Sequence, residues 1–169
     1  MFKLSLNWVC LVILIFANGC SQKKLSERDR KLQDRQQKID VKKNELLPLT
    51  GKYIGTLIGE NEYLQNVKLF LEVKDIPESS GQGDPVLTPK IVGNLRFLYG
   101  SEQGHEYIDC SVVSAEFNKS TRQLTVIVTH KQFNEMILSG TVAEKRFIGA
   151  WNASSLGMRG TFRLDKESP

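Results

Sequence analysis

Hydrophobic and polar residues alternate with a period of two along most of the chain after Pro48. This period is typical of β-strands that bury one face, and turn-forming residues divide the pattern into eight runs. In the fourth run, at 107–117, the apolar set is less regular. The positions expected to point inward in the other seven runs are Gly51, Tyr53, Gly55, Leu57; Val67, Leu69, Leu71, Val73; Ile91, Gly93, Leu95, Phe97; Leu124, Val126, Val128; Met136, Leu138, Gly140, Val142; Phe147, Gly149, Trp151; and Met158, Gly160, Phe162, Leu164.

The opposite positions of these runs are largely charged or polar, as expected for antiparallel strands with one wet face. Short connections at 118–121, 143–146 and 152–157 suit hairpins between successive strands. Glycines recur among the inward positions, which favours a sheet that coils tightly enough to close and to remove its edges. The sequence therefore predicts a mainly β domain, an eight-stranded antiparallel up-and-down barrel, with an eight-stranded β-sandwich as the alternative.

The domain resembles the lipocalin and calycin group of barrels, on the evidence of its Gly-aromatic motifs GKY, GNLRF, FIGAW and RGTF. The opening GKYIGTL is also similar to the first hairpin of envelope-stress lipoproteins whose lipocalin-like barrel starts GxYxGxL. Those proteins carry a CxxC in that hairpin, whereas this chain reads IGENEYLQ. The resemblance therefore implies a fold and no metal or redox role.

Residues 22–47 contain no glycine or proline and are rich in Lys, Arg, Glu and Gln, which predicts a helix. Its apolar residues recur every seventh position, at Leu25, Leu32, Ile39 and Leu46, so only half of a coiled-coil seam is present. Two interpretations remain open. The helix is either a solvated stalk whose apolar row steadies its lower end against the barrel, or it presents a weak dimer stripe or a face that lies on a partner.

The N-terminus has the pattern of a secretory signal: Lys3 is followed by a nine-residue apolar run at 8–16, too short to span a bilayer. The run ends in Ala17, Asn18, Gly19 and Cys20, which resembles the lipobox of bacterial lipoproteins. That resemblance implies diacylglyceryl transfer to the Cys20 thiol, cleavage before Cys20 and anchoring by several acyl chains. Ser21 after the cysteine implies the outer membrane; we expect its periplasmic face, with the cell surface as the alternative.

These patterns divide the chain into a cleaved signal peptide at 1–19, a lipidated N-terminus and helical spacer at 20–47, and a barrel domain at 48–169. The spacer carries nine basic and five acidic residues, whereas the domain carries thirteen basic and fourteen acidic ones. A folded domain that is near neutral argues against nucleic-acid binding, which needs a basic face.

No catalytic or metal-binding pattern stands out, so we expect no enzymatic activity and no cofactor beyond the acyl lipid. His105 and His130 lie near predicted turns without a metal-ligand partner, and Cys110 is expected to be a buried strand residue. The segment 76–89 is expected to be a turn-rich loop at one end of the barrel.

Two functions remain. In the first, the barrel binds a small apolar or amphipathic ligand, with Tyr53, Phe97, Trp151 and Phe162 lining its interior. In the second, the core is solid and the protein is an envelope scaffold or a module that binds another envelope protein. Eight strands enclose a bore that side chains can just fill or that can hold one small ligand, so strand number does not decide between them.

The lipobox resemblance predicts that cells fed radioactive palmitate will label this protein through Cys20. In the Cys20→Ala chain the acceptor thiol is gone, so the label should be lost; autoradiography of the immunoprecipitated protein measures it. Equal label in both chains would exclude the anchor.

Overall fold

A computed structural model describes residues 26–59, 63–78, 85–101, 104–132 and 134–168. The chain divides into two compact units, Met1–Gln36 and Gln37–Pro169. The proposed signal peptide and Cys20 lie outside the described residues, so their assignment stays a prediction.

The charged segment is helical, as predicted: α2 spans Glu27–Leu46. Ser26 caps its first turn, because its hydroxyl accepts the Asp29 N–H at 3.2 Å while the Asp29 carboxylate accepts the Ser26 N–H at 3.3 Å. The helix gives way to the short 3-10 helix η1 (Leu47–Leu49), where Pro48 cannot continue an α-helical ladder.

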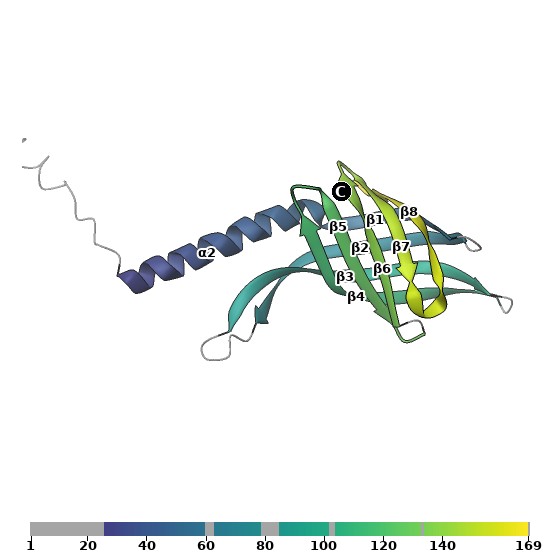
Figure 1. Ribbon diagram of the computed structural model, residues 1–169, viewed down its shortest axis with the longest axis horizontal. Helices are drawn as coiled ribbons and strands as arrows, with labels where there is room; N and C mark the ends of the chain where they lie inside the picture. Colours follow the sequence, from purple (N-terminus) through teal and green to yellow (C-terminus); the bar gives the residue numbers. More distant parts are fainter. Residues whose placement is uncertain (1–25, 60–62, 79–84, 102–103, 133, 169) are drawn as a thin grey trace, which may run out of the picture. The chain divides into compact units, whose positions relative to one another are not determined.

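Eight strands follow and form one closed antiparallel barrel in sequence order (Figure 1). The β1–β8 ladder, from Tyr53 opposite Lys166 to Gly59 opposite Gly160, closes the sheet. The prediction of an up-and-down barrel is confirmed, and the sandwich alternative is wrong. The strands are β1 (Gly51–Gly59), β2 (Tyr63–Glu78), β3 (Val86–Ser101), β4 (Gly104–Asn118), β5 (Gln123–His130), β6 (Asn134–Ala143), β7 (Arg146–Ala153) and β8 (Met158–Lys166).

The irregular fourth run has a structural cause. Ile108 and Cys110 point into the core at the start of β4, but Ala115 and Phe117 do so at its end, so the inward parity changes from even to odd. The change falls at a register shift between Val112 and Ser114 in the β4–β5 ladder, where Val113 is the extra residue. A β-bulge of this kind bends its strand and breaks the period of two.

Both ends of the segment 76–89 are strands and not the loop that we expected. The β2–β3 ladder pairs Ile76 with Thr88, Pro77 with Leu87 and Glu78 with Val86. Residues 79–84, between these ends, lie outside the described residues. The turn-forming residues at 77–85 predicted a loop, but the ladder extends into both ends of the segment.

Proline is tolerated in a ladder where its nitrogen faces away from the neighbouring strand. Pro77 pairs with Leu87 and Pro89 pairs with Asp75, so the two pairs are two residues apart and of the same kind. Both prolines therefore fit that rule together.

Two glycines let β6 and β7 approach closely. Gly140 lies directly opposite Gly149, and a Cβ added at Gly149 would lie 2.1 Å from the Ser139 carbonyl oxygen and 2.4 Å from the Gly140 Cα. Both obstacles are backbone atoms, so a side chain there would force the strands apart.

We therefore predict that Gly149→Ala lowers the free energy of unfolding by about 1–3 kcal/mol, the usual cost of overpacking. Urea denaturation of the two chains measures the difference. Ala150→Val is the matched control, because Ala150 is exposed on the outer face, and a change within about 0.5 kcal/mol is expected there. Equal loss in both variants would contradict the close-approach argument.

Candidate functional site

The four residues predicted to line a ligand cavity all point into the barrel, where they are packed among other core side chains. Tyr53 is 1 % exposed and Phe97, Trp151 and Phe162 are 2 % exposed. A ligand-sized cavity would leave space beside the side chains that line it. Instead, the described interior also contains ten large apolar side chains that are 0 % exposed: Leu57, Val67, Leu69, Leu95, Leu124, Val126, Val128, Leu138, Phe147 and Leu164.

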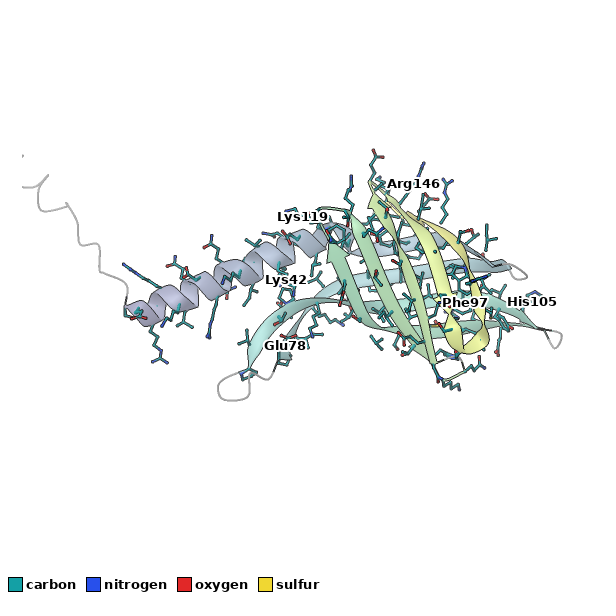
Figure 2. All side chains as sticks on the ribbon, in the orientation of Figure 1. Lys42, Glu78, Phe97, His105, Lys119 and Arg146 are labelled. Atoms are coloured by element: carbon teal, nitrogen blue, oxygen red, sulfur yellow. The ribbon has the colours of Figure 1, made fainter. Side chains whose placement is uncertain are left out.

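The filled bore follows from the size of its residues. Phe147 and Phe162 meet edge to face with ring centroids 4.6 Å apart, and the Trp151 indole N–H donates to the Ile58 carbonyl oxygen at 3.3 Å. Figure 2 shows Phe97 within the body of the barrel. An eight-stranded bore is just wide enough for side chains to fill, and large ones fill it here. Space for a binding site therefore has to lie outside the bore.

One end of the barrel is closed by the segment that joins the helix to β1. Leu46 and Leu49 are buried there, and the Tyr53 hydroxyl donates to the Leu49 carbonyl oxygen at 2.9 Å. Lys166 of β8 donates through Nζ to the Pro48 carbonyl oxygen at 2.8 Å. These contacts fix the last turn of α2 against the barrel end.

We call this closing segment, residues 46–49, the plug. Beside the plug, β3 and β4 separate. They pair only from Asn94 opposite Ser111 to Ser101 opposite Gly104. Within the described residues, 86–93 of β3 therefore pair only with β2, and 112–118 of β4 pair only with β5. Figure 1 shows the ends of β2 and β3 running past their neighbours. We call the gap between these two segments the β3–β4 split.

The split is maintained by features of both strands and of the helix. The bulge at Val113 bends β4, and Pro89 removes one backbone donor from the β3 edge. Leu46 lines the space between the strands and is 8 % exposed. Two contacts hold the helix end to both sides, from Lys43 to Asp75 of β2 at 2.8 Å and from Lys119 beyond β4 to Glu45 at 3.2 Å.

A cleft of about 420 Å³ lies in the split. Its volume is within the range of ligand pockets. Its walls come from α2, the end of β2, and the parts of β3 and β4 that do not pair with each other. Lys42, one of its lining residues, lies on the part of α2 nearest the barrel (Figure 2). Charged residues stand at its rim and apolar ones form its floor, the latter being Leu46, Ile76, Pro89, Ile91, Ala115 and Phe117.

The chemistry-bearing residues of the sequence do not gather at this cleft. His105 lies at the opposite end of the β3–β4 hairpin (Figure 2), and within the described part of the chain no three His, Cys, Asp or Glu residues form a metal-binding group. Cys110 is buried, and burial, with a smaller contribution from Asp109, raises the pKa of its thiol to about 12. At neutral pH this thiol is protonated and packs as a small apolar side chain.

Comparisons with protein-family models, with curated proteins and with solved structures gave no match. The closed eight-stranded barrel is consistent with a lipocalin-like fold, and such a fold can bind small ligands. No helix in the described ranges is long and apolar enough to cross a membrane.

The plug predicts a specific dependence of stability on pH. Burial raises the pKa of Tyr53 from 10 in the unfolded chain to about 12. Between pH 10 and 12 the unfolded chain loses this proton while the folded chain keeps it, so the contribution to stability is complete below pH 10 and lost toward pH 12. In the Tyr53→Phe chain, we expect this loss to be smaller by about 2 kcal/mol.

Urea denaturation at a series of pH values measures the effect. Tyr53→Phe should also cost about 1 kcal/mol at pH 7, because the Leu49 carbonyl loses its donor. Tyr107→Phe is the control at pH 7, since Tyr107 is 49 % exposed, and its free energy of unfolding should stay close to that of the unaltered chain. Parallel profiles for Tyr53→Phe and the unaltered chain would contradict the assignment.

Proposed function

We propose that this protein is a non-enzymatic, membrane-tethered module that binds another protein of the cell envelope at the β3–β4 split. The filled bore carries this proposal, because the side chains that would face a ligand are 1–2 % exposed. The split supplies what the bore lacks: a cleft whose floor includes the partly exposed Ile76, Ala115 and Phe117, charged residues at its rim, and two strand edges that have no neighbour on the side of the split. The acyl anchor on Cys20 and the outer-membrane location belong to the proposal through the lipobox resemblance alone.

Surface exposure next to the split supports protein binding there. Val113, the bulge residue, is 58 % exposed at the edge of the cleft, and Leu87 on the unpaired part of β3 is 52 % exposed. Apolar side chains on an unpaired edge promote association with other chains, so soluble proteins usually restrict them. A protein-binding surface requires exposed apolar side chains of this kind.

A second candidate is the binding of a small amphipathic molecule in the same cleft. The cleft volume of about 420 Å³ favours it, as does the combination of an apolar floor with Lys42 and Lys90 at the rim. A small molecule retained by protein purified from its own host, detected by native mass spectrometry, would favour this candidate over protein binding.

Site-specific photo-cross-linking tests the main proposal. A chain with p-benzoylphenylalanine in place of Val113, expressed in the native host, should form an adduct with another protein on irradiation. The matched control places the same photoreactive residue at Ile148, which is 45 % exposed on β7, away from the split. Immunoblotting should show the adduct for position 113 only. Identical patterns at both positions, or no protein adduct at either, would overturn the proposal.

A further inference from the structure

The unpaired edges of the split carry hydrogen-bonding groups at regular intervals. Along a strand, alternate residues direct their backbone N–H and C=O to opposite sides, so each edge exposes a row of donors and acceptors. Only another extended backbone repeats these groups with the matching spacing of about 3.4 Å per residue. This requirement selects an extended polypeptide over a compact small molecule.

The β4 edge is the better acceptor of the two. Pro89 has no N–H, which leaves a gap in the β3 edge, and Lys90 is already paired with Glu78, with 2.8 Å between Nζ and the carboxylate. On β4, Glu116 is exposed at the cleft, and no ion pair or hydrogen bond involves its carboxylate among the described residues. The β4 edge thus has an intact backbone and one available negative charge.

The chain itself shows which residues such an edge fits. If the β3–β4 register continued across the one-residue bulge, Lys90 would lie opposite Glu116, with Ile91 opposite Ala115 and Pro89 opposite Phe117. A segment with a basic residue between two apolar ones would therefore match β4. Its basic side chain would face Glu116 on the outer side of the sheet, and its apolar side chains would lie beside Ala115 and Phe117 on the inner side. Opposite charges that face each other across strands contribute about 0.2–1 kcal/mol.

We infer that the β4 edge at 114–118 binds an extended segment of a partner protein by strand addition, and that this segment has an apolar-basic-apolar pattern with the basic residue opposite Glu116. The added strand runs antiparallel to β4 and places its apolar side chains on the floor formed by Leu46, Phe117 and Ile91. This inference rests on the proposed function and names the kind of partner.

A peptide based on the chain's own β3 sequence tests the inference. The probe is Leu-Thr-Val-Lys-Ile-Val-Gly, which copies residues 87–93 with valine in place of the proline. A second peptide carries Glu in place of Lys. Each is titrated into the ¹⁵N-labelled full chain in detergent micelles, and the amide shifts of residues 114–118 are followed by NMR.

We expect the Lys peptide to shift these amides and to bind roughly three- to tenfold more tightly than the Glu peptide. Glu116→Lys should reverse that preference, and it should not disturb folding because the side chain is exposed. The matched control is Glu135→Lys, an exposed outward position on β6 that lies away from the split, where the preference should be unchanged.

Three results would overturn the inference. The first is that millimolar peptide causes no change in the amide shifts of residues 114–118. The second is that Glu116→Lys does not alter the preference for the Lys peptide. The third is that the amide shifts depend on protein concentration alone, which would mean that a second copy of the chain fills the edge. A protein adduct at position 113 without peptide binding would leave the proposed function standing and remove only strand addition. If neither the adduct at position 113 nor peptide binding is observed, the protein-binding function is excluded as well.

Discussion

Closure of eight strands into one barrel is the constraint on which the rest of the structure depends. It fixes the bore at a width that large side chains fill, and the sequence places Tyr53, Phe97, Trp151 and several leucines at inward positions. Burial of these residues stabilises the fold, but it also uses the space in which lipocalin-like barrels hold a ligand. Binding is then left to the outer surface and to the places where the sheet is incomplete.

Most of the fold was predictable because the expected inward positions in seven of the eight runs follow the period of two, and the one further change of parity in the described strands, between Leu64 and Val67, falls before the predicted part of β2. The candidate site was not predictable, because it depends on a bulge in β4 and on prolines within the β2–β3 ladder. The bulge at Val113 changes the inward parity within β4, and a single sequence does not distinguish an inserted residue from an irregular loop. The turn-forming residues at 77–85 indicated a loop over 76–89, although Pro77 and Pro89 take positions in the ladder and β2 and β3 continue past them.

The same bulge and prolines explain why the barrel does not close along its whole length. Continuing the β3–β4 ladder would bring together residues that match in charge and polarity, such as Lys90 and Glu116. The bulge bends one strand, the proline removes a donor from the other, and Leu46 occupies the space between them. The helix end is in turn held by ion pairs to β2 and to the turn after β4, so the plug and the split form one arrangement.

An edge kept open in this way has to avoid indiscriminate pairing. Soluble proteins protect edges with prolines, bulges and charges, and the split contains all three. Pro89 disfavours pairing along β3, whereas the carboxylate of Glu116 disfavours acidic segments along β4 and leaves basic ones acceptable. The protection is therefore unequal between the two edges: a proline interrupts the row of backbone donors on β3, whereas β4 keeps its backbone groups and carries a charge that would favour a basic segment over an acidic one.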